Sequence, residues 1–419
     1  TLNIVDIAHN ASSWTGALLT KGLLFSFLIF FSLGAFAKSA QFPFHEWLVT
    51  AMTGPTTVSA LIHAATMVKA GVYFMLRFMP IFYLASRLVP AATPDYNLFF
   101  FTVASIGAFT AFLMATQATV AREIKLILAF CTASQLGYMF LGAGASGLIK
   151  EFSIGFLTTF SYLMNHAIFK AALFLAAGAI LHAIESRYMT DGGGLRKYMP
   201  ATFLSMLLAT FSLAGIPPFM GFWTKDGLIE IVHEAHLTPQ LILAIVTAGL
   251  TAFYSTRLIF VAFCREESKH LEEVKRELGV HEAHPIMLVP YSLLALIPLA
   301  IGISWPFILR GLFGSIAKHV LALEEVPEVT LHLNIQLVAA SLGVAVLGII
   351  TSLLIYVTPR YDKKVNTSVE KSPILLNLRN FLYDRWYINS IYYKIFVNGG
   401  RRLSSALSKW FDGAVVDRF

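Results

Sequence analysis

Lysine and histidine side chains occur inside stretches of the chain that are otherwise apolar enough to cross a membrane. Lys38, His63 and Lys69 share the first such region, KSAQFPFHEWLVTAMTGPTTVSALIHAATMVK. An ionisable group within a bilayer costs at least about 2.5–3.5 kcal/mol, so its presence there indicates a function. Burial lowers the pKa of a lysine toward neutrality and a nearby carboxylate raises it again, whereas an arginine stays charged. Buried lysines and histidines therefore predict a route for protons.

The three residues differ in how strongly their surroundings indicate this chemistry. Lys38 precedes a helix break at Ala40–Pro43, and broken helices at membrane depth occur in protein interiors or wet cavities. A central proton-binding lysine is predicted, against the alternative of a lysine that reaches the headgroups from a helix end. For His63, on an otherwise apolar helix, the residues alone leave open a packed core residue and a relay of protons between Lys38 and the second half of the chain. For Lys69, nearer the predicted helix end, relay and headgroup contact both stay open.

Two further pairs occur in the second half of the chain. Glu123 and Lys125 begin an apolar stretch, REIKLILAF, where the alternative is again a charge that reaches the membrane surface. His166 and Lys170 lie four residues apart in YLMNHAIFK and so share one face of a helix. Their position in the middle of the span favours proton transfer over a static buried pair. Tyr162 lies one turn before His166 on the same predicted helix. Because a phenol hardly releases its proton at neutral pH, we expect a water molecule, and not the Tyr162 hydroxyl, to pass the proton along at this position.

Lys225 and Asp226 follow a second helix break. The sequence GIPPFMG removes two backbone donors and interrupts the apolar stretch before GFWTKDGLIE. A lysine beside a carboxylate at such a break is predicted to carry protons, and the alternative is a surface pair on a short helix. Both breaks join an apolar helix to a short amphipathic one. Paired interrupted segments in two halves of a chain indicate an internal repeat with a transport site.

The composition indicates that membrane-crossing helices position these residues. Of the 419 residues 57% are hydrophobic and only 13% are charged, about half the charged fraction of soluble proteins. A soluble enzyme is excluded, and the net charge of +7 is attributed to basic loops rather than to a nucleic-acid partner. A crossing takes about 20 apolar residues, which predicts an all-α, polytopic transmembrane fold. The predicted spans are 17–37, 56–79, 97–116, 124–145, 152–182, 199–235, 239–264, 286–305 and 335–357.

Basic residues gather in alternate loops between these spans. Arg187, Arg196, Lys197 and Arg265 are among those that fall on one side, and few fall on the other. Positive residues mark the cytoplasmic or matrix side of a membrane protein. The asymmetry therefore orients the chain and predicts a multi-pass integral protein of a prokaryotic cell membrane or of the inner mitochondrial membrane.

The sequence contains two cysteines and none of the common cofactor-binding motifs. Cys131 and Cys264 lie far apart without ligand-type spacing, and no iron–sulfur, haem or flavin motif occurs, so neither a cofactor nor a metal is predicted in this chain.

Residues 373–411 alternate apolar with basic or aromatic positions, which predicts an amphipathic helix in the membrane interface. The alternative is an ordinary tail packed on the protein's own loops.

The segments KSAQFPFHEWL and GPTTVSALIHAATMVKAGVY resemble the signature of the antiporter-like subunits of respiratory complex I. The chain most resembles the L-type (chain 5) subunit, its archaeal deazaflavin-linked relatives, and the large subunit of multisubunit cation/proton antiporters. The resemblance implies inverted five-helix repeats with two interrupted helices and a C-terminal amphipathic lateral helix. The implied divisions are the end of a first repeat (1–79), a second repeat (97–264), additional transmembrane helices (286–357) and the start of the lateral helix (373–419).

The resemblance also implies roles for individual residues, and it favours His63 as a relay between Lys38 and the second repeat. Lys125 would be the central lysine of the second channel and Glu123 a carboxylate at its mouth. Lys225 and Asp226 would be the exit lysine and its acidic neighbour. Lys38 would pair with a glutamate on an earlier helix, and because family members carry further helices before this motif, the chain is expected to be part of a longer protein.

By resemblance, the function is that of a proton-translocating membrane subunit of a complex I-type NAD(P)H- or deazaflavin–quinone oxidoreductase, with the redox centres in other subunits. Its partners would be the other membrane and peripheral subunits of such an assembly and the lipid bilayer. One alternative is an Na⁺ (or K⁺)/proton antiporter subunit, and another is a non-conducting membrane scaffold whose buried charges are static pairs. The segment FLYDRWYINSIYYKIFV, similar to the lead-in of the lateral helix, favours complex I over the antiporters.

Overall fold

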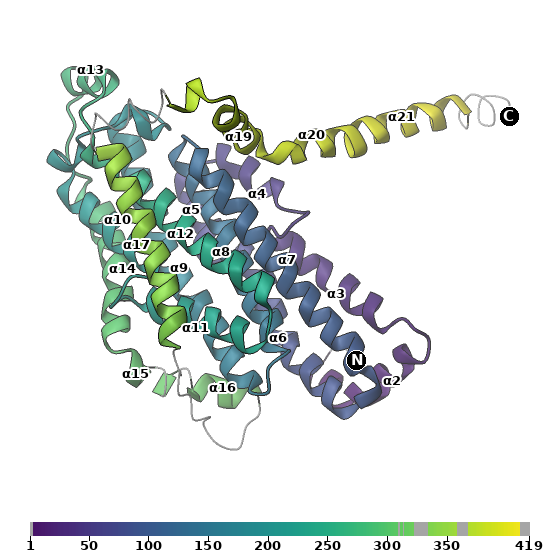
Figure 1. Ribbon diagram of the computed structural model, residues 1–419. Coiled ribbons are helices and arrows are strands. Elements are labelled where there is room, and N and C mark those ends of the chain that lie inside the picture. Colours follow the sequence, from purple (N-terminus) through teal and green to yellow (C-terminus); the bar gives the residue numbers. More distant parts are fainter. Residues whose placement is uncertain (1–2, 309–310, 313, 322–333, 358–367, 411–419) are drawn as a thin grey trace. The chain divides into compact units, whose positions relative to one another are not determined.

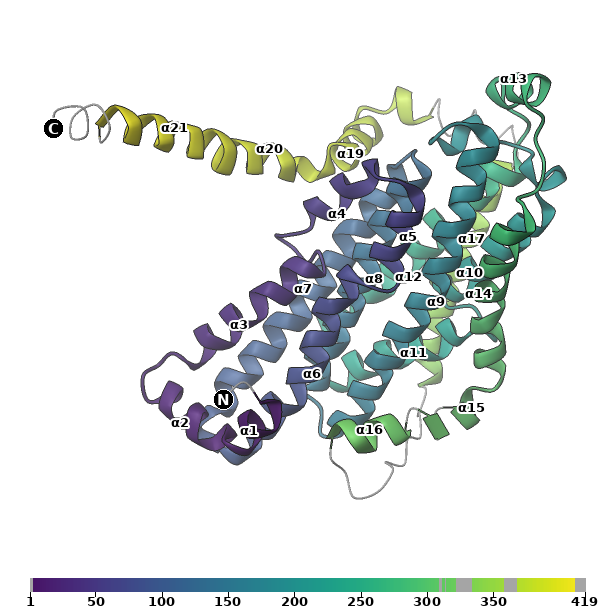
Figure 2. The same ribbon diagram turned by 180° about the vertical axis from the view of Figure 1, so that it is seen from behind.

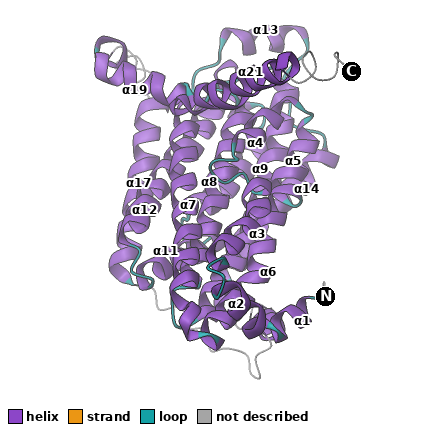
Figure 3. Ribbon diagram, turned by 90° about the vertical axis from the view of Figure 1, so that its right-hand side faces the viewer, coloured by secondary structure: helices purple, strands orange, loops and turns teal. Residues whose placement is uncertain are grey.

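The secondary structure of the described residues is almost entirely helical. This computed structural model describes residues 3–308, 311–312, 314–321, 334–357 and 368–410. Beside helices and turns these residues contain one isolated antiparallel β-bridge, between Glu123 and Tyr188, and no strand (Figure 3). The backbone divides into two compact units, Thr1–Lys363 and Lys364–Phe419.

The first unit contains the apolar helices (Figures 1 and 2). Its described α-helices are α1 (Ile4–His9), α2 (Ala11–Leu19), α3 (Leu24–Lys38), α4 (Glu46–Thr50), α5 (Thr56–Ala64), α6 (Met67–Leu88), α7 (Thr93–Val120), α8 (Ile124–Ser146), α9 (Phe152–Ile184), α10 (Pro200–Ala214), α11 (Met220–Glu234), α12 (Thr238–Ile259), α13 (Lys269–Glu277), α14 (Pro285–Ile303), α15 (Trp305–Ile308), α16 (Gly314–Leu321) and α17 (Ile335–Val357). A π-helical turn, η5 (Phe260–Cys264), continues α12.

Seven helical segments of the described chain are long and apolar enough to cross a membrane, or eight if the bent pair α2–α3 counts as one span. This confirms the predicted all-α, polytopic fold. The division into two inverted repeats stays a prediction. The seven segments are Thr56–Leu88, Pro90–Val120, Ile124–Ser146, Phe152–Ile184, Thr238–Cys264, Pro285–Ile303 and Ile335–Val357.

The span predicted over 17–37 is a bent pair of helices rather than one straight helix. Helix α2 ends at Leu19, α3 begins at Leu24, and the two meet at 116°. Gly22 adopts a left-handed backbone conformation in the turn, with φ of 65°, which a residue without a Cβ adopts at little steric cost. The apolar composition continues on both sides of the turn, so hydropathy alone does not reveal the bend.

The helix predicted over 56–79 is longer than expected and is interrupted. Helix α5 ends at Ala64, and α6 continues from Met67 to Leu88. Lys69 therefore lies in the first turn of α6, near the middle of an apolar segment rather than at its end. Its side chain is 7% exposed, which does not fit a lysine that reaches the headgroups.

Helices α7 and α8 lie unusually close together because glycines face their contact. A Cβ on Gly107 would lie 2.4 Å from the backbone nitrogen of Leu141, and one on Gly137 would lie 2.6 Å from that of Ala111. Small residues that let helix backbones approach are the usual means of helix association in membranes. Helix α8 is consequently buried along nearly its whole length, so its polar side chains lie inside the protein.

Helix α9 is the longest helix of the described chain and the centre of the packing. It contacts α5, α8, α10, α11 and α14, so a polar residue in its middle is enclosed by other helices. Helix α13 lies at one end of this bundle, and α2 and α16 lie at the other (Figures 1 and 2). The helices that carry the predicted site residues thus meet around α9.

The second unit contains α19 (Pro373–Tyr383), α20 (Ile388–Tyr392) and α21 (Asn398–Leu407). The prediction of one continuous amphipathic helix over 373–411 is wrong at its centre, because residues 385–387 have positive φ values and bend the chain. None of the residues in these three helices is buried, and Tyr383, Tyr387 and Tyr393 are exposed. Residues 411–419 lie outside the described residues, and the lateral-helix assignment stays a prediction.

Candidate functional site

Both predicted helix breaks are present in the structure. The first separates α3 from α4, and the second separates α10 from α11. In each break one residue has a left-handed backbone conformation, Ala40 with φ of 51° and Gly215 with φ of 78°. A Cβ on Gly215 would lie 3.3 Å from Cδ of Lys225, so the second break is packed directly against that lysine. The break therefore both ends α10 and makes room for a charged side chain.

Lys225 and Asp226 lie side by side in α11 and are buried, at 2% and 7% exposure. The Nζ of Lys225 lies 3.5 Å from the carbonyl oxygen of Leu213 and 5.2 Å from the centre of the Tyr138 ring. Oδ1 of Asp226 accepts a hydrogen bond of 2.7 Å from the hydroxyl of Ser341, and Oδ2 has no hydrogen-bond partner within the described chain. The alternative of a surface pair does not fit this burial.

His166 and Lys170 occupy successive turns of α9 and are completely buried. Nδ1 of His166 is hydrogen-bonded to Nζ of Lys69 from α6, and its Nε2 has no partner in the described residues. Nζ of Lys170 donates a hydrogen bond of 3.1 Å to the carbonyl oxygen of Leu128. The structure therefore brings the predicted pair together and adds Lys69 to it.

His63 lies against the same part of α9. Its ring stacks on Phe174 with 4.6 Å between the ring centres, and Nζ of Lys170 lies 6.0 Å from the centre of that phenyl ring. Neither ring nitrogen of His63 has a hydrogen-bond partner among the described residues, and its side chain is fully buried. Lys170, Lys125 and Lys69 are the charged groups close enough to act on it electrostatically.

Lys125 and Glu123 begin α8, as predicted, but they have different surroundings. The Nζ of Lys125 is hydrogen-bonded to the carbonyl oxygen of Gly54, which precedes α5. Glu123 is the N-cap residue of α8, and its carboxylate lies 3.8 Å from the guanidinium of Arg187. Glu123 thus lies toward the loop side and Lys125 toward the helices that carry His63.

Lys38 is the predicted site residue that the structure does not bring to the others. It is the last residue of α3, and its side chain is exposed. Within the described chain no hydrogen bond or ion pair joins Lys38 to another predicted site residue. Its role stays a prediction that rests on the sequence alone.

Three polar residues that we did not predict continue the site from Tyr162. The hydroxyl of Tyr162 donates a hydrogen bond to Oε1 of Gln135. Nε2 of Gln135 lies 3.4 Å from the hydroxyl of Thr251, which also accepts from the hydroxyl of Tyr254 at 3.5 Å. All four side chains are buried. The sequence feature that could have indicated this network is Gln135, a glutamine inside an apolar span. Its partners could not be predicted, because Thr251 is 116 residues away in the sequence and Tyr162 lies on another helix.

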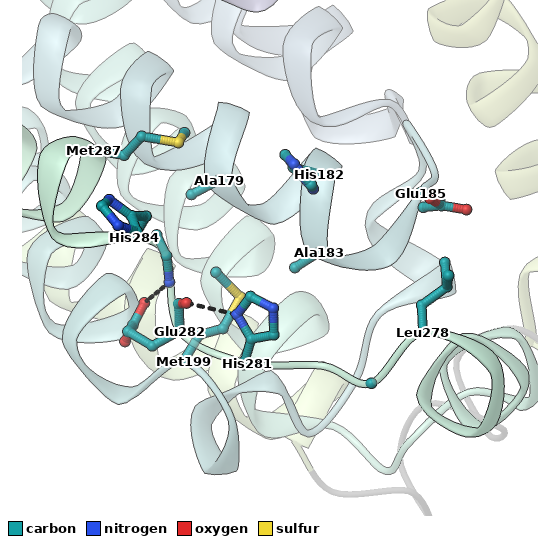
Figure 4. Close-up of a pocket in the computed structure, with 12 residues that line it drawn as sticks. Ala179, His182, Ala183, Glu185, Met199, Leu278, His281, Glu282, His284 and Met287 are labelled. Carbon is teal, nitrogen blue, oxygen red and sulfur yellow. Dashed lines mark hydrogen bonds between the residues drawn. The ribbon is translucent and has the colours of Figure 1, made fainter.

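A cavity of about 280 Å³ lies where α9 ends (Figure 4). His182 from α9 and His281 and His284 from the loop before α14 line it. Glu282 also lines it, but its Oε2 accepts hydrogen bonds from the backbone nitrogens of Ala201 and Thr202 and so caps the start of α10. No group of three or more metal-ligating side chains suited to an ion occurs in the described residues.

These features define a polytopic α-helical membrane protein with interrupted helices and buried lysine and histidine side chains in its interior. Residues 1–251 match the family described as NADH:quinone oxidoreductase/Mrp antiporter, transmembrane. The chain belongs to this family, which confirms the resemblance of its two sequence segments.

Individual relatives agree with this assignment. The chain is 37% identical to NAD(P)H-quinone oxidoreductase chain 5 of Picosynechococcus over 423 residues, which cover 94% of this chain and 59% of the relative. It is 36% identical to the chloroplastic NAD(P)H-quinone oxidoreductase subunit 5 of Mesostigma viride, covering 95% and 58%. A chain of the Mrp complex from Dietzia has the same fold, with a TM-score of 0.67 and 24% identity over 95% of this chain and 42% of that one. The chain thus spans less than two thirds of the length of these relatives.

Proposed function

We propose that this chain moves protons across the membrane as a subunit of a complex I-type NAD(P)H–quinone oxidoreductase. The names of the curated relatives support the parent complex, and the family match supports the transport role. In this proposal the chain supplies no redox centre, and other membrane and peripheral subunits of the assembly carry the electron transfer.

One observation carries the proposal: buried lysines that lack a carboxylate partner. Lys69, Lys125 and Lys170 are hydrogen-bonded to an imidazole or to backbone carbonyl oxygens, and none forms an ion pair within the described chain. An ammonium group removed from water without a counter-charge is strongly unfavourable. A lysine in such a place gains free energy by giving up its proton, and an imidazole beside it is a suitable acceptor. A static scaffold would be expected to pair these charges.

The proposed route runs through Lys38, His63, Lys125, His166, Lys170 and Lys225, with Lys69 as the added contact of His166. Glu123 is proposed to take up protons from the loop side of α8. Lys225 and Asp226 are proposed to release protons at the other end of the route.

The step from α9 to Lys225 is proposed to pass the buried tyrosines. Tyr162 lies one turn before His166, its ring centre is 6.4 Å from that of Tyr138, and Nζ of Lys225 lies 5.2 Å from the centre of the Tyr138 ring. The hydroxyl of Tyr162 donates to Oε1 of Gln135, and the amide of Gln135 donates in turn to the hydroxyl of Thr251. Because phenols do not titrate at neutral pH, we propose that these hydroxyls order water molecules that carry the proton.

The deciding experiment is proton pumping by the assembled complex in sealed vesicles, wild type against Lys170→Ala, with sodium varied. We expect the variant to lose acidification at every sodium concentration. Lys150→Ala is the matched control, because Lys150 is an exposed loop lysine. Unchanged pumping in Lys170→Ala would instead support the scaffold alternative, and strict dependence on sodium would support the antiporter alternative.

A further inference from the structure

Helix α11 carries three carboxylates on one face. Asp226, Glu230 and Glu234 follow one another at intervals of four residues, and residues four apart lie above one another on the same face of a helix. Their exposure increases along the helix, because Asp226 is buried, Glu230 is half-buried and Glu234, the last residue of α11, is exposed. This carboxylate row therefore leads from the interior, beside Lys225, to the surface.

The carboxylate row ends on the side of the protein opposite to the basic loops. The chain turns after α11, and the membrane-crossing segment Thr238–Cys264 then leads to α13, whose basic residues are Lys269, Lys275 and Arg276. Basic residues mark the cytoplasmic or matrix side. Because a crossing segment separates Glu234 from that side, the row ends on the side to which a proton pump of this orientation releases its protons.

Helix α17 holds the two inner carboxylates. Oδ1 of Asp226 accepts a hydrogen bond of 2.7 Å from the hydroxyl of Ser341, and Oε2 of Glu230 accepts one of 3.2 Å from the backbone nitrogen of Asn334. Asn334 precedes Ser341 by seven residues, which is about two helical turns, so α17 follows the carboxylate row. Oδ2 of Asp226 is buried and has no hydrogen-bond partner among the described residues, so it is free to bind a proton or a water molecule.

The carboxylate row is unfavourable for the stability of α11. Like charges four residues apart repel each other, and carboxylates near the C-terminus of a helix lie at the negative end of its dipole. None of the three forms an ion pair within the described chain. Lys225 adjoins Asp226 in the sequence, but its ammonium group lies toward the carbonyl oxygen of Leu213. A row that costs stability and joins a buried lysine to the surface indicates a function.

We propose that protons leave Lys225 along this row, with Asp226, Glu230 and Glu234 as successive carriers and α17 as the helix that positions them. The inference rests on the proposed proton transport and extends it beyond Asp226. The ammonium group of Lys225 gives a proton through a water molecule to the carboxylate of Asp226, which leaves a neutral amine and a carboxylic acid. Carriers four residues apart have Cβ atoms about 5–6 Å from each other, a gap that one water molecule bridges. The proton passes in this way to Glu230, to Glu234 and to the solvent, and each carboxylate is left ionised again.

Two substitutions at Glu230 separate proton transfer from a structural role. Glu230→Gln keeps the side-chain length and an oxygen that accepts from Asn334, but an amide does not carry protons. Glu230→Asp keeps the acid but shortens the side chain, so it weakens that hydrogen bond. In redox-driven acidification of sealed vesicles that contain the assembled complex, we expect Glu230→Gln to pump about tenfold more slowly and Glu230→Asp to stay within about twofold of the wild type. A positioned acid–base group contributes about 100-fold or more, and water at this half-buried position recovers part of it.

The order of the two variants decides the proposal. Pumping by Glu230→Gln that equals or exceeds that of Glu230→Asp would overturn it, because Glu230 would then only hold the start of α17. The matched control is Glu277→Gln, the same change at the exposed last residue of α13, and equal slowing there would also overturn the proposal. Lys170→Ala, measured in the same preparation, tests the proposed function separately. Its loss of pumping beside normal pumping by Glu230→Gln would refute the carboxylate row alone.

A second measurement does not depend on the pumping rate. Redox-induced infrared difference spectra of the complex contain the carbonyl band of each carboxylic acid that gains or loses a proton during turnover. We expect this band to be weaker in Glu230→Gln than in the wild type and unchanged in Glu277→Gln. Identical bands in Glu230→Gln and the wild type would show that Glu230 does not change its protonation and would overturn the proposal.

Discussion

Replacement of Lys69 by methionine separates a proton relay from a static buried pair. The ammonium group of Lys69 is hydrogen-bonded to Nδ1 of His166 and lies 3.5 Å from the carbonyl oxygen of Leu163. Methionine is unbranched and similar in length, so Lys69→Met keeps most of the packing in α6 while it removes the proton-binding group. The sequence left two interpretations of this lysine open, and the structure favours the interior one.

The expected loss follows from the surroundings of the side chain. Without Lys69, a proton reaches His166 with no proton-binding side chain on the way. The free-energy cost of placing a charge in that buried gap is at least about 2.5–3.5 kcal/mol. At about 1.4 kcal/mol per factor of ten, pumping should slow by about 60- to 300-fold. The unpaired Nδ1 of His166 should cost about 1–3 kcal/mol of stability, which is small enough for the complex to assemble.

The assay is redox-driven acidification of proteoliposomes that contain the assembled complex, normalised to the amount of complex. Lys69→Arg is the informative companion, because arginine keeps the charge and the hydrogen-bond donors but does not release a proton. We expect both variants to pump poorly and Lys150→Met, at an exposed position, to pump normally. Normal pumping by Lys69→Met would refute the reasoning, and normal pumping by Lys69→Arg alone would show that only a static charge is needed.

Three further predictions follow from other contacts. Tyr162→Phe removes the hydroxyl that donates to Gln135 and should slow pumping by about tenfold, with recovery in Tyr162→His; an unimpaired phenylalanine variant would exclude this hydroxyl from the route. Glu282→Ala uncaps α10 and should lower the stability by about 0.5–2 kcal/mol in thermal unfolding, whereas the same change at the exposed Glu272 of α13 should have little effect. Hydrogen bonds from Lys275, Tyr198 and Lys197 hold the pKa of Glu267 below its ordinary value of 4.5. The ionised carboxylate therefore stabilises the folded state fully above pH 4.5, and this contribution is lost as the pH falls through the lowered pKa. Amide-exchange protection of α13 should fall with acid in the wild type and should not change over this range in Glu267→Gln; the same acid response in both would exclude this carboxylate.

Local sequence alone was enough to predict the class of the fold and several of its interruptions. Apolar runs of membrane length predicted the helical spans because the bilayer requires their backbone groups to be satisfied within each helix. The GIPPFMG sequence predicted the break between α10 and α11 because proline removes the donors that a continuous helix needs. The bend at Gly22 was not predicted, since nothing in the composition distinguishes it from a glycine within a helix.

The residues of the candidate site were also visible in the sequence, because lysine and histidine are costly inside apolar spans. Their partners were not. The contacts of Lys69 with His166, of Gln135 with Thr251, and of Asp226 with Ser341 join residues 97, 116 and 115 positions apart.

Such contacts depend on how close two helices approach and which faces they turn toward each other. For α7 and α8 the approach depends on Gly107 and Gly137, where any side chain would clash with the facing backbone. The sequence determined which residues could bind protons in this protein. Only the tertiary structure decided which of them are neighbours, because side chains on separate helices are brought together by packing and not by their spacing along the chain.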